Sequence, residues 1–255
     1  MVDIHSHILP GVDDGARTLE EAVGMVQIAA DDGTTCIVAT PHCNDRYPYS
    51  LEQNRRLLSE LSAAVGTRMG LALGCDFHLS YENLQALLAG NRTYTINQGP
   101  YLLVEFTDYA IPPQLADTLH QLRLQGLIPI VTHPERNPLL QRGLGLLGKL
   151  IAMGCPVQVT ASSLLGRFGS PARQSVEELL RRQMVHLVAS DAHDTEHRPP
   201  RLSAACADVA RNFGRERADA LFRDNPRAVV EGNALPYFPE PVARERKRRF
   251  SFFRR

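Results

Sequence analysis

Histidines and carboxylates occur along this chain at spacings that suit metal binding. His5 and His7 are separated by one residue, and the same spacing returns far along the chain as Asp191 and His193. Side chains two positions apart on a β-strand point to the same face. Imidazole and carboxylate groups without thiolates suit Zn, Mn or Fe. The two pairs therefore predict two parts of one metal site.

Further polar residues stand at the ends of short apolar runs between these pairs, at intervals of about 30 residues, which is the length of a βα unit. Asp14 comes from the loop after the first run, where Gly11 and Gly15 permit a sharp turn. A catalytic metal needs only three or four protein ligands, so we expect two or three divalent ions. The full set of candidate metal ligands is His5, His7, Asp14, His42, Asp76, Glu105, His133, Asp191 and His193.

Two arginines follow predicted metal ligands closely. Arg136 lies in "THPERNP" after His133, and Arg198 lies in "SDAHDTEHRPP" after His193. Guanidinium groups bind phosphate oxygens with paired donors. Clustered metal ions activate water and hold phosphoryl oxygens during displacement at phosphorus. Together these residues predict a phosphate site beside the metals.

The segments that carry these residues alternate between two patterns. Short apolar runs without strict alternation indicate strands buried on both faces of a parallel sheet. Amphipathic segments with helix-capping residues separate them, as in the stretch from Thr18 to Gly33. The alternation predicts an α/β fold in which the carboxyl ends of the strands share one rim. The predicted strands are 2–4, 34–40, 71–76, 101–106, 127–133, 155–161 and 185–190, and the clearest helices are 18–33, 50–66, 112–126 and 170–183.

Composition narrows the class of protein. The chain has 255 residues, a hydrophobic fraction of 44% and a formal net charge of zero, which indicate a globular protein and no nucleic-acid partner. No signal peptide or membrane-spanning run is visible, and the five cysteines form no C-x-x-C. We therefore expect a cytoplasmic protein.

The end of the chain differs from the rest. We predict one domain over residues 1–235, followed by a proline-flanked basic tail over 236–255 that ends in "ARERKRRFSFFRR". One interpretation of the tail is a disordered solubilising segment. The other is a segment that makes peripheral contact with an anionic membrane.

The motifs "DIHSHILPGVDDG", "TPH", "VEF", "THPER" and "SDAHDTEHRPP" together resemble the PHP (polymerase and histidinol phosphatase) superfamily. Within it they are most similar to the bacterial tyrosine-protein phosphatases associated with capsule and exopolysaccharide genes. The resemblance implies a distorted (β/α)7 TIM-like barrel with three metal ions, often manganese. It also implies a tyrosine-phosphorylated partner, such as a bacterial tyrosine kinase, and says nothing of the oligomeric state.

The resemblance also implies an arrangement of the ligands. The first ion would take His5, His7, Asp76 and Asp191; the second would take Glu105 and His133, with Asp76 bridging; and the third would take Asp14, His42 and His193. Arg136 and Arg198 would hold the phosphate while a metal-activated hydroxide attacks phosphorus. Two residues depart from the family pattern: Asp76 stands where Glu is usual, and Cys43 where many members have a second histidine.

The residues and the resemblance are compatible with three functions. The first is a metal-dependent tyrosine phosphatase, the second a phosphatase for histidinol phosphate or another small molecule, and the third a phosphotyrosine-binding regulator without turnover. A thiol-based tyrosine phosphatase is excluded, because it needs Cys-x5-Arg and no cysteine of this chain has arginine six positions on. We expect Asp13 to shape the loop that carries Asp14. Asp194 and His197 are likewise expected to be loop residues.

Overall fold

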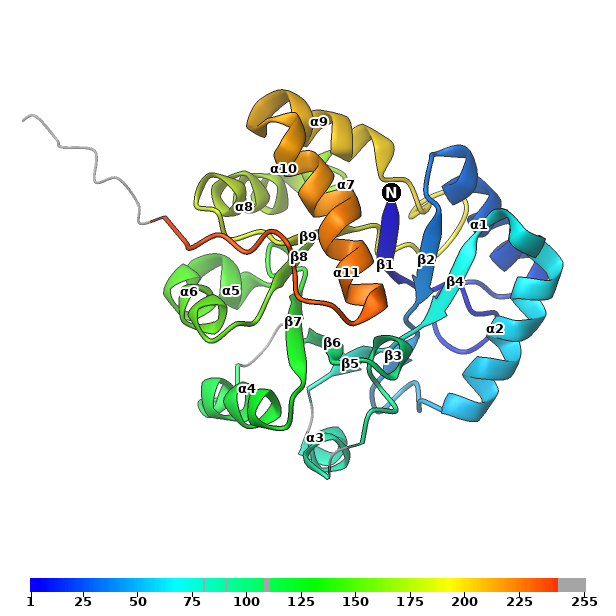
Figure 1. Ribbon diagram of the computed structural model, residues 1–255, viewed down its shortest axis with the longest axis horizontal. Helices are drawn as coiled ribbons and strands as arrows, with labels where there is room; N and C mark the ends of the chain where they lie inside the picture. Colours follow the sequence, from blue (N-terminus) through cyan, green and yellow to red (C-terminus); the bar gives the residue numbers. More distant parts are fainter. Residues whose placement is uncertain (80, 90, 108–110, 243–255) are drawn as a thin grey trace, which may run out of the picture.

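Parallel strands occupy the centre of the molecule and helices surround them (Figure 1). The computed structural model describes residues 1–79, 81–89, 91–107 and 111–242. One sheet has the order β1-β2-β4 and the other β3-β5-β6-β7-β8-β9. The strands are β1 (Val2–Ser6), β2 (Cys36–Ala39), β3 (His42–Cys43), β4 (Gly70–Leu73), β5 (Asp76–His78), β6 (Tyr101–Glu105), β7 (Ile128–Thr132), β8 (Val157–Thr160) and β9 (Leu187–Ala189).

Most connections between successive strands contain a helix or a helical turn. Thr18 and Ser50 cap the first two helices with their hydroxyl groups, as their positions before apolar-periodic segments predict. The helices are α1 (Leu19–Asp31), α2 (Leu51–Val65), α3 (Tyr81–Leu88), α4 (Leu115–Leu124), α5 (Pro138–Arg142), α6 (Leu144–Ala152), α7 (Ala161–Leu164), α8 (Gly169–Arg181), α9 (Ser203–Phe213), α10 (Arg215–Asp219) and α11 (Asn225–Glu231). Short helical turns are η1 (Gly66–Arg68), η2 (Ile96–Gln98) and the π-helical η3 (Ala220–Asp224).

The predicted strands are present, but two of them bend and contribute to both sheets. The strand predicted over 34–40 ends as β2, and the chain resumes as β3 after Pro41. The strand predicted over 71–76 is interrupted in the same way between β4 and β5. At this bend a Cβ on Gly74 would lie 2.9 Å from Ile96 Cγ1, so the packing of this side chain against the Gly74 backbone leaves no room for a larger residue.

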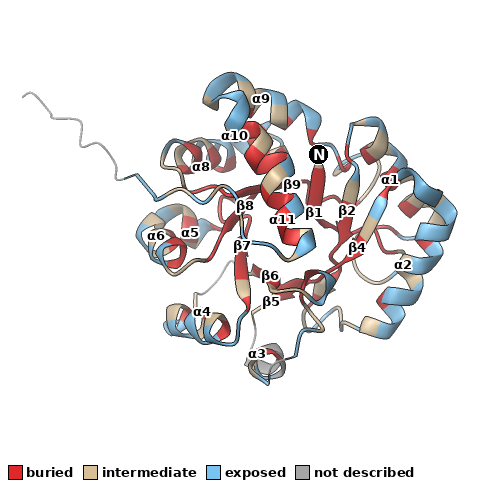
Figure 2. Cartoon of the chain, viewed as in Figure 1, coloured by how far each residue is buried: buried red, intermediate tan, exposed pale blue. Residues whose placement is uncertain are grey.

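Strand register brings predicted ligands side by side. In the pairing of β3 with β5, the predicted ligands His42 and Asp76 lie opposite each other. In the pairing of β5 with β6, the predicted ligand Glu105 lies opposite His78, which is not among the predicted ligands. The strands are almost entirely buried while the helices expose their outer faces (Figure 2). This burial on both faces explains the continuous apolar runs in the sequence.

The two sheets meet where β1 approaches β9. Ser6 and Ala192 form a parallel bridge, His7 N–H donates to Ala192 O at 2.8 Å, and Asp191 N–H donates to His5 O at 2.9 Å. Helix α11 packs against β1 and β9. The structure thus establishes an α/β fold with parallel sheets.

The last part of the tail, "ARERKRRFSFFRR" over 243–255, lies outside the described residues. Before it, Val242 N–H donates to Arg182 O at 2.9 Å, so the chain is still attached to the end of α8 at that point. Among the described residues, no helix has the length and apolar character needed to cross a membrane.

Candidate metal centre and active site

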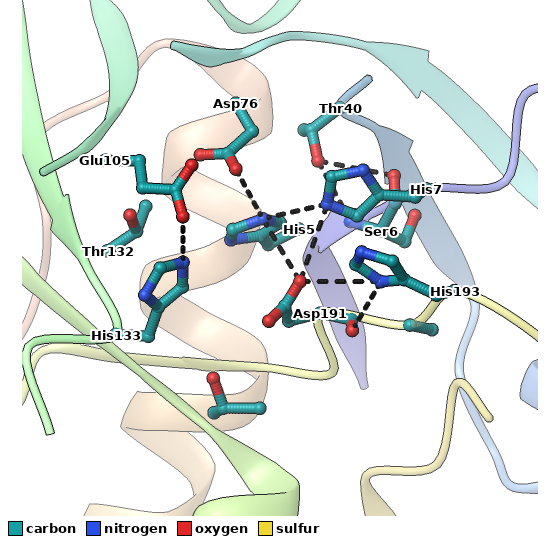
Figure 3. A network of polar contacts seen from close by, with 12 residues as sticks. His5, Ser6, His7, Thr40, Asp76, Glu105, Thr132, His133, Asp191 and His193 are labelled. Carbon is teal, nitrogen blue, oxygen red and sulfur yellow. Dashed lines mark hydrogen bonds and ion pairs between the residues drawn. The ribbon is translucent and has the colours of Figure 1, made fainter. Parts of the chain in front are cut away.

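His5, in β1, and His7, directly after that strand, form the centre of a buried polar cluster (Figure 3). His5 and His7 are 0% and 1% exposed, and their Nε2 atoms lie 3.4 Å apart. Asp191 Oδ1 lies 3.5 Å from each of these nitrogens. Asp76 Oδ2 lies 3.6 Å from His5 Nε2. The H-x-H and D-x-H pairs, far apart in sequence, therefore meet as predicted.

Hydrogen bonds on the far side of each ring orient the two histidines. His5 Nδ1 lies 3.0 Å from Gln158 Oε1, and His7 Nδ1 lies 2.8 Å from Asp13 Oδ2. Both partner oxygens only accept, so each Nδ1 donates a proton to its partner, and each Nε2 is the atom that would bind a metal once it is deprotonated. This is the arrangement that metal-ligating histidines adopt.

A second group of potential ligands lies beside the first. His7, Asp14, His42 and His193 each offer one ligand atom, and these atoms all lie within 4.8 Å of one another. Asp14 Oδ1 is 3.4 Å from His42 Nε2 and 3.5 Å from His193 Nε2. The Asp14 side chain is 49% exposed, so this side of the cluster is open to solvent.

A third group joins the ends of β3, β5 and β6. His42 Nδ1 lies 3.0 Å from Asp76 Oδ2 and 3.7 Å from Glu105 Oε2. His133 Nε2 lies 3.7 Å from Glu105 Oε1. The two ring nitrogens of His42 thus face two different groups. The prediction had assigned His42 to the third site alone.

Electrostatics at the cluster favour bound cations. The Asp76 side chain is buried, yet neither oxygen accepts a hydrogen bond of good geometry. Burial opposes its ionisation, but the positive charges of His5 and His42 hold its pKa well below the usual value. Burial and the Asp76 charge raise the pKa of Glu105 to about 8. Buried carboxylates crowded together without donors fit divalent cations.

Two ligand candidates adopt a backbone conformation that is rare outside glycine. His133 has φ 30° and Asp191 has φ 52°. Each follows the last residues of a strand, β7 and β9. Such strain persists where the surrounding structure enforces it, and it is common at functional sites.

The two predicted phosphate-binding arginines converge on one carboxylate oxygen. Arg136 Nη1 and Arg198 Nη2 both donate to Asp191 Oδ2, and Arg198 Nη2 also donates to the Asp191 carbonyl oxygen at 2.9 Å. Asp191 therefore directs one oxygen to the histidines and the other to the arginines. Each arginine side chain is 27% exposed, so both reach from the cluster toward solvent.

Loop residues support this arrangement. Asp13 Oδ1 accepts from Gly15 N–H at 3.0 Å, which confirms its predicted part in shaping the loop, and Asp13 Oδ2 accepts from His42 N–H. Asp194 Oδ1 accepts from three backbone N–H groups of the loop that leads to Arg198, as expected of a loop residue.

The structure brings the predicted ligands and arginines together, and it also shows supporting residues that were not predicted from the sequence. Gln158, which orients His5, is a polar residue inside an apolar run. A polar side chain in a buried strand is the feature of the sequence that could have indicated its role. Glu135 is also buried, and it accepts from Thr160 N–H and from Ser163 Oγ–H. Cys43, at the position of a frequent family histidine, is 4% exposed and packs in the hydrophobic core.

A model of the family described as "Capsular polysaccharide synthesis, CpsB/CapC" matches residues 1–231. The chain belongs to this family. YwqE of Bacillus subtilis, a tyrosine-protein phosphatase, is 30% identical over 262 residues, which cover 99% of this chain and 100% of YwqE. A CapC protein of Staphylococcus aureus is 37% identical over 203 residues, covering 78% of this chain and 79% of that protein.

A solved structure extends the comparison to three dimensions. It comes from the crystal structures of YwqE from Bacillus subtilis and CpsB from Streptococcus pneumoniae, described as unique metal-dependent tyrosine phosphatases. Its TM-score with this CpsB/CapC chain is 0.87 at 30% identity, and the match covers 96% of this chain and 100% of that one. The shared fold therefore includes the strands that carry the cluster.

Proposed function

We propose that this chain is a metal-dependent protein-tyrosine phosphatase of capsular or exopolysaccharide synthesis. The observation that carries the proposal is the match to YwqE over the whole of its length and 99% of this chain, together with the buried histidine–carboxylate cluster. Its substrate would be a tyrosine-phosphorylated protein, and a bacterial tyrosine kinase of polysaccharide export is our proposed partner. We propose the cytoplasm as the compartment.

We further propose that two or three divalent ions, with manganese foremost and Fe or Zn as alternatives, bind the candidate ligands. His5, His7, Asp76 and Asp191 would hold one ion, and Glu105 and His133, sharing Asp76, would hold another. Asp14, His42 and His193 would hold the third. Bound ions there would supply Lewis-acid stabilisation of phosphoryl oxygens and lower the pKa of water.

The chain's own residues would bind and orient the phosphate. Arg136 and Arg198 would donate N–H groups to its oxygens, where negative charge develops in the transition state. A groove of about 570 Å³ lined by Asp14, Tyr47 and His193 lies beside the cluster and would admit the substrate side chain. Tyrosine leaves with a phenol pKa of about 10, so it needs less help from a general acid than an alkyl alcohol does.

We infer that the two sheets form one distorted (β/α)7 barrel, with residues 1–235 as its single domain. The bridge between Ser6 and Ala192, and the hydrogen bonds beside it, support continuity of strand pairing from β9 to β1. The bends at Pro41 and Gly74 then account for the division into two sheets within a ring of seven strands.

The test is phosphate release by the purified full chain, stripped of metal and reloaded with Mn²⁺. We expect release from a phosphotyrosine peptide that depends on the metal and exceeds release from histidinol phosphate and from a phosphoserine peptide. Higher activity on histidinol phosphate would establish the small-molecule alternative. Phosphotyrosine binding without turnover, with Mn²⁺, Fe²⁺ or Zn²⁺, would establish a regulator instead.

A further inference from the structure

One aromatic ring contacts both arginines of the candidate site. Phe168 lies in the loop between α7 and α8. Its ring centroid is 4.4 Å from Arg136 Cζ and 5.7 Å from Arg198 Cζ. Arg136 follows β7 and Arg198 follows β9, so the ring joins side chains that come from separate loops. Neither the sequence motifs nor the metal cluster accounts for Phe168.

The backbone of the loop fixes the position of this ring. Gly166 has φ +78° and Gly169 has φ +86°, a conformation that favours glycine. Gly166 N–H donates to Ser163 O at 3.0 Å, and Gly169 N–H donates to Gly166 O at 3.0 Å. Phe168 is thus presented from a hydrogen-bonded turn directly before α8.

The arginines need a partner that does not occupy their N–H donors. Both guanidinium groups donate to the same oxygen of Asp191, which brings two positive charges close together. Arg198 Nε is buried and has no hydrogen-bond acceptor. An aromatic ring attracts a guanidinium through its π-electrons and leaves in-plane N–H groups available for an anion.

We propose that Phe168 is a positioning residue that holds Arg136 and Arg198 as a pair for binding the phosphate group. This inference rests on the proposed phosphatase function and deepens it. Phe168 acts through the arginines, and the phosphate contacts their N–H donors instead of the ring. A second carboxylate in the place of the ring would also hold the arginines, but it would compete with the phosphate for their N–H donors.

The first experiment compares Phe168→Leu, which keeps an apolar side chain without π-electrons, with Phe168→Tyr, which keeps the ring. Leu165→Ala is the matched control, because Leu165 is 37% exposed in the same loop. The dissociation constant of inorganic phosphate is measured by calorimetry on the Mn²⁺-loaded full chain. We expect Phe168→Leu to weaken binding about tenfold, and both Phe168→Tyr and Leu165→Ala to bind like the original chain.

The second experiment places Phe168→Leu in a background with Arg136→Lys and Arg198→Lys. A compact ammonium does not stack on a ring as guanidinium does, so we expect Phe168→Leu to change phosphate binding little in this background. The proposal is overturned if Phe168→Leu weakens phosphate binding about tenfold in the double-lysine background as well. It is also overturned if Phe168→Leu alone leaves phosphate binding unchanged. Failure of Phe168→Tyr to retain binding overturns it as well.

Two further measurements separate positioning from a merely structural role. Metal content and thermal unfolding of Phe168→Leu should match those of the original chain. On a phosphotyrosine peptide, KM should rise together with the phosphate dissociation constant. If the original chain hydrolyses no phosphomonoester, the phosphatase proposal fails, while the phosphate-binding cycle still decides the role of Phe168.

Discussion

Replacing Asp13 with asparagine removes the charge beside His7 Nδ1, which orients this candidate metal ligand, while keeping the shape of the side chain. The Asp13 side chain is 0% exposed. Its Oδ2 accepts from His7 Nδ1–H at 2.8 Å and from His42 N–H at 3.0 Å, and its Oδ1 accepts from Gly15 N–H at 3.0 Å. One carboxylate thus fixes two candidate ligands and the loop that carries Asp14.

The expected loss follows from these three bonds. An asparagine side chain has one acceptor oxygen, so its NH₂ group must face at least one donor that the carboxylate now satisfies. A hydrogen bond to a charged group contributes about 1.5–3 kcal/mol. Because tenfold in affinity corresponds to about 1.4 kcal/mol, we expect Asp13→Asn to weaken metal binding about 10- to 100-fold, the range found for residues that support metal ligands.

The assay is competition for Mn²⁺ and Zn²⁺ between the metal-free protein and a chromogenic chelator. Asp45→Asn is the control, because Asp45 is exposed and lies in the loop after β3. It makes the same change in net charge and should leave metal affinity unchanged. Equal losses in the two variants would mean that net charge alone governs affinity, and unchanged affinity in Asp13→Asn would refute the orienting role.

Three other perturbations test separate features. Gly15→Ala would place a Cβ 2.0 Å from the His7 carbonyl oxygen; we expect about 1–3 kcal/mol less stability and weaker metal binding in denaturant and chelator titrations. Gly145→Ala, with nothing near its Cβ, should show neither effect. Burial lowers the pKa of His186 to about 3 from 6.5, so the unfolded state binds a proton that the folded state excludes. His186 should therefore contribute a fall in the stability of the metal-free protein as pH drops from 6.5 toward 3, of up to about 1.4 kcal/mol per pH unit. His186→Asn, which keeps an acceptor, should flatten that slope in urea unfolding; an unchanged slope would contradict the assignment. Deleting residues 243–255 should reduce binding to anionic vesicles while leaving metal content unchanged, and equal vesicle binding would favour the solubilising interpretation of the tail.

The candidate ligands could be predicted from the sequence because each strand of a parallel sheet ends at the same rim. Together with the expected closure of the strands into a barrel, that rule brings His5 and Asp191 together. It could not identify Gln158 or Phe168, because their roles depend on which ring or guanidinium lies across the rim. The close packing at the bend between β4 and β5 was equally hidden, since it involves Ile96, which is distant in sequence from Gly74.

The later helices show the same limit. The sequence pattern predicted α1, α2, α4 and α8 from capping residues and amphipathic spacing. It gave no separate prediction for α9, α10 and α11. Helix α11 (Asn225–Glu231) has only 7 residues and packs against β1 and β9. Helices this short depend on tertiary contacts more than on their own propensity.

The meeting of β1 with β9 has a consequence for the order of folding. Ser190 and His5, which come together there, are 185 residues apart in the chain. At a synthesis rate of about 5–20 residues per second, roughly 10–40 s separates their emergence from the ribosome. During that interval β1 lacks its partner on one side, and His5 and His7 lack Asp191. A nascent chain therefore cannot complete the candidate metal centre until β9 has been made, which would place metal capture among the last steps of maturation.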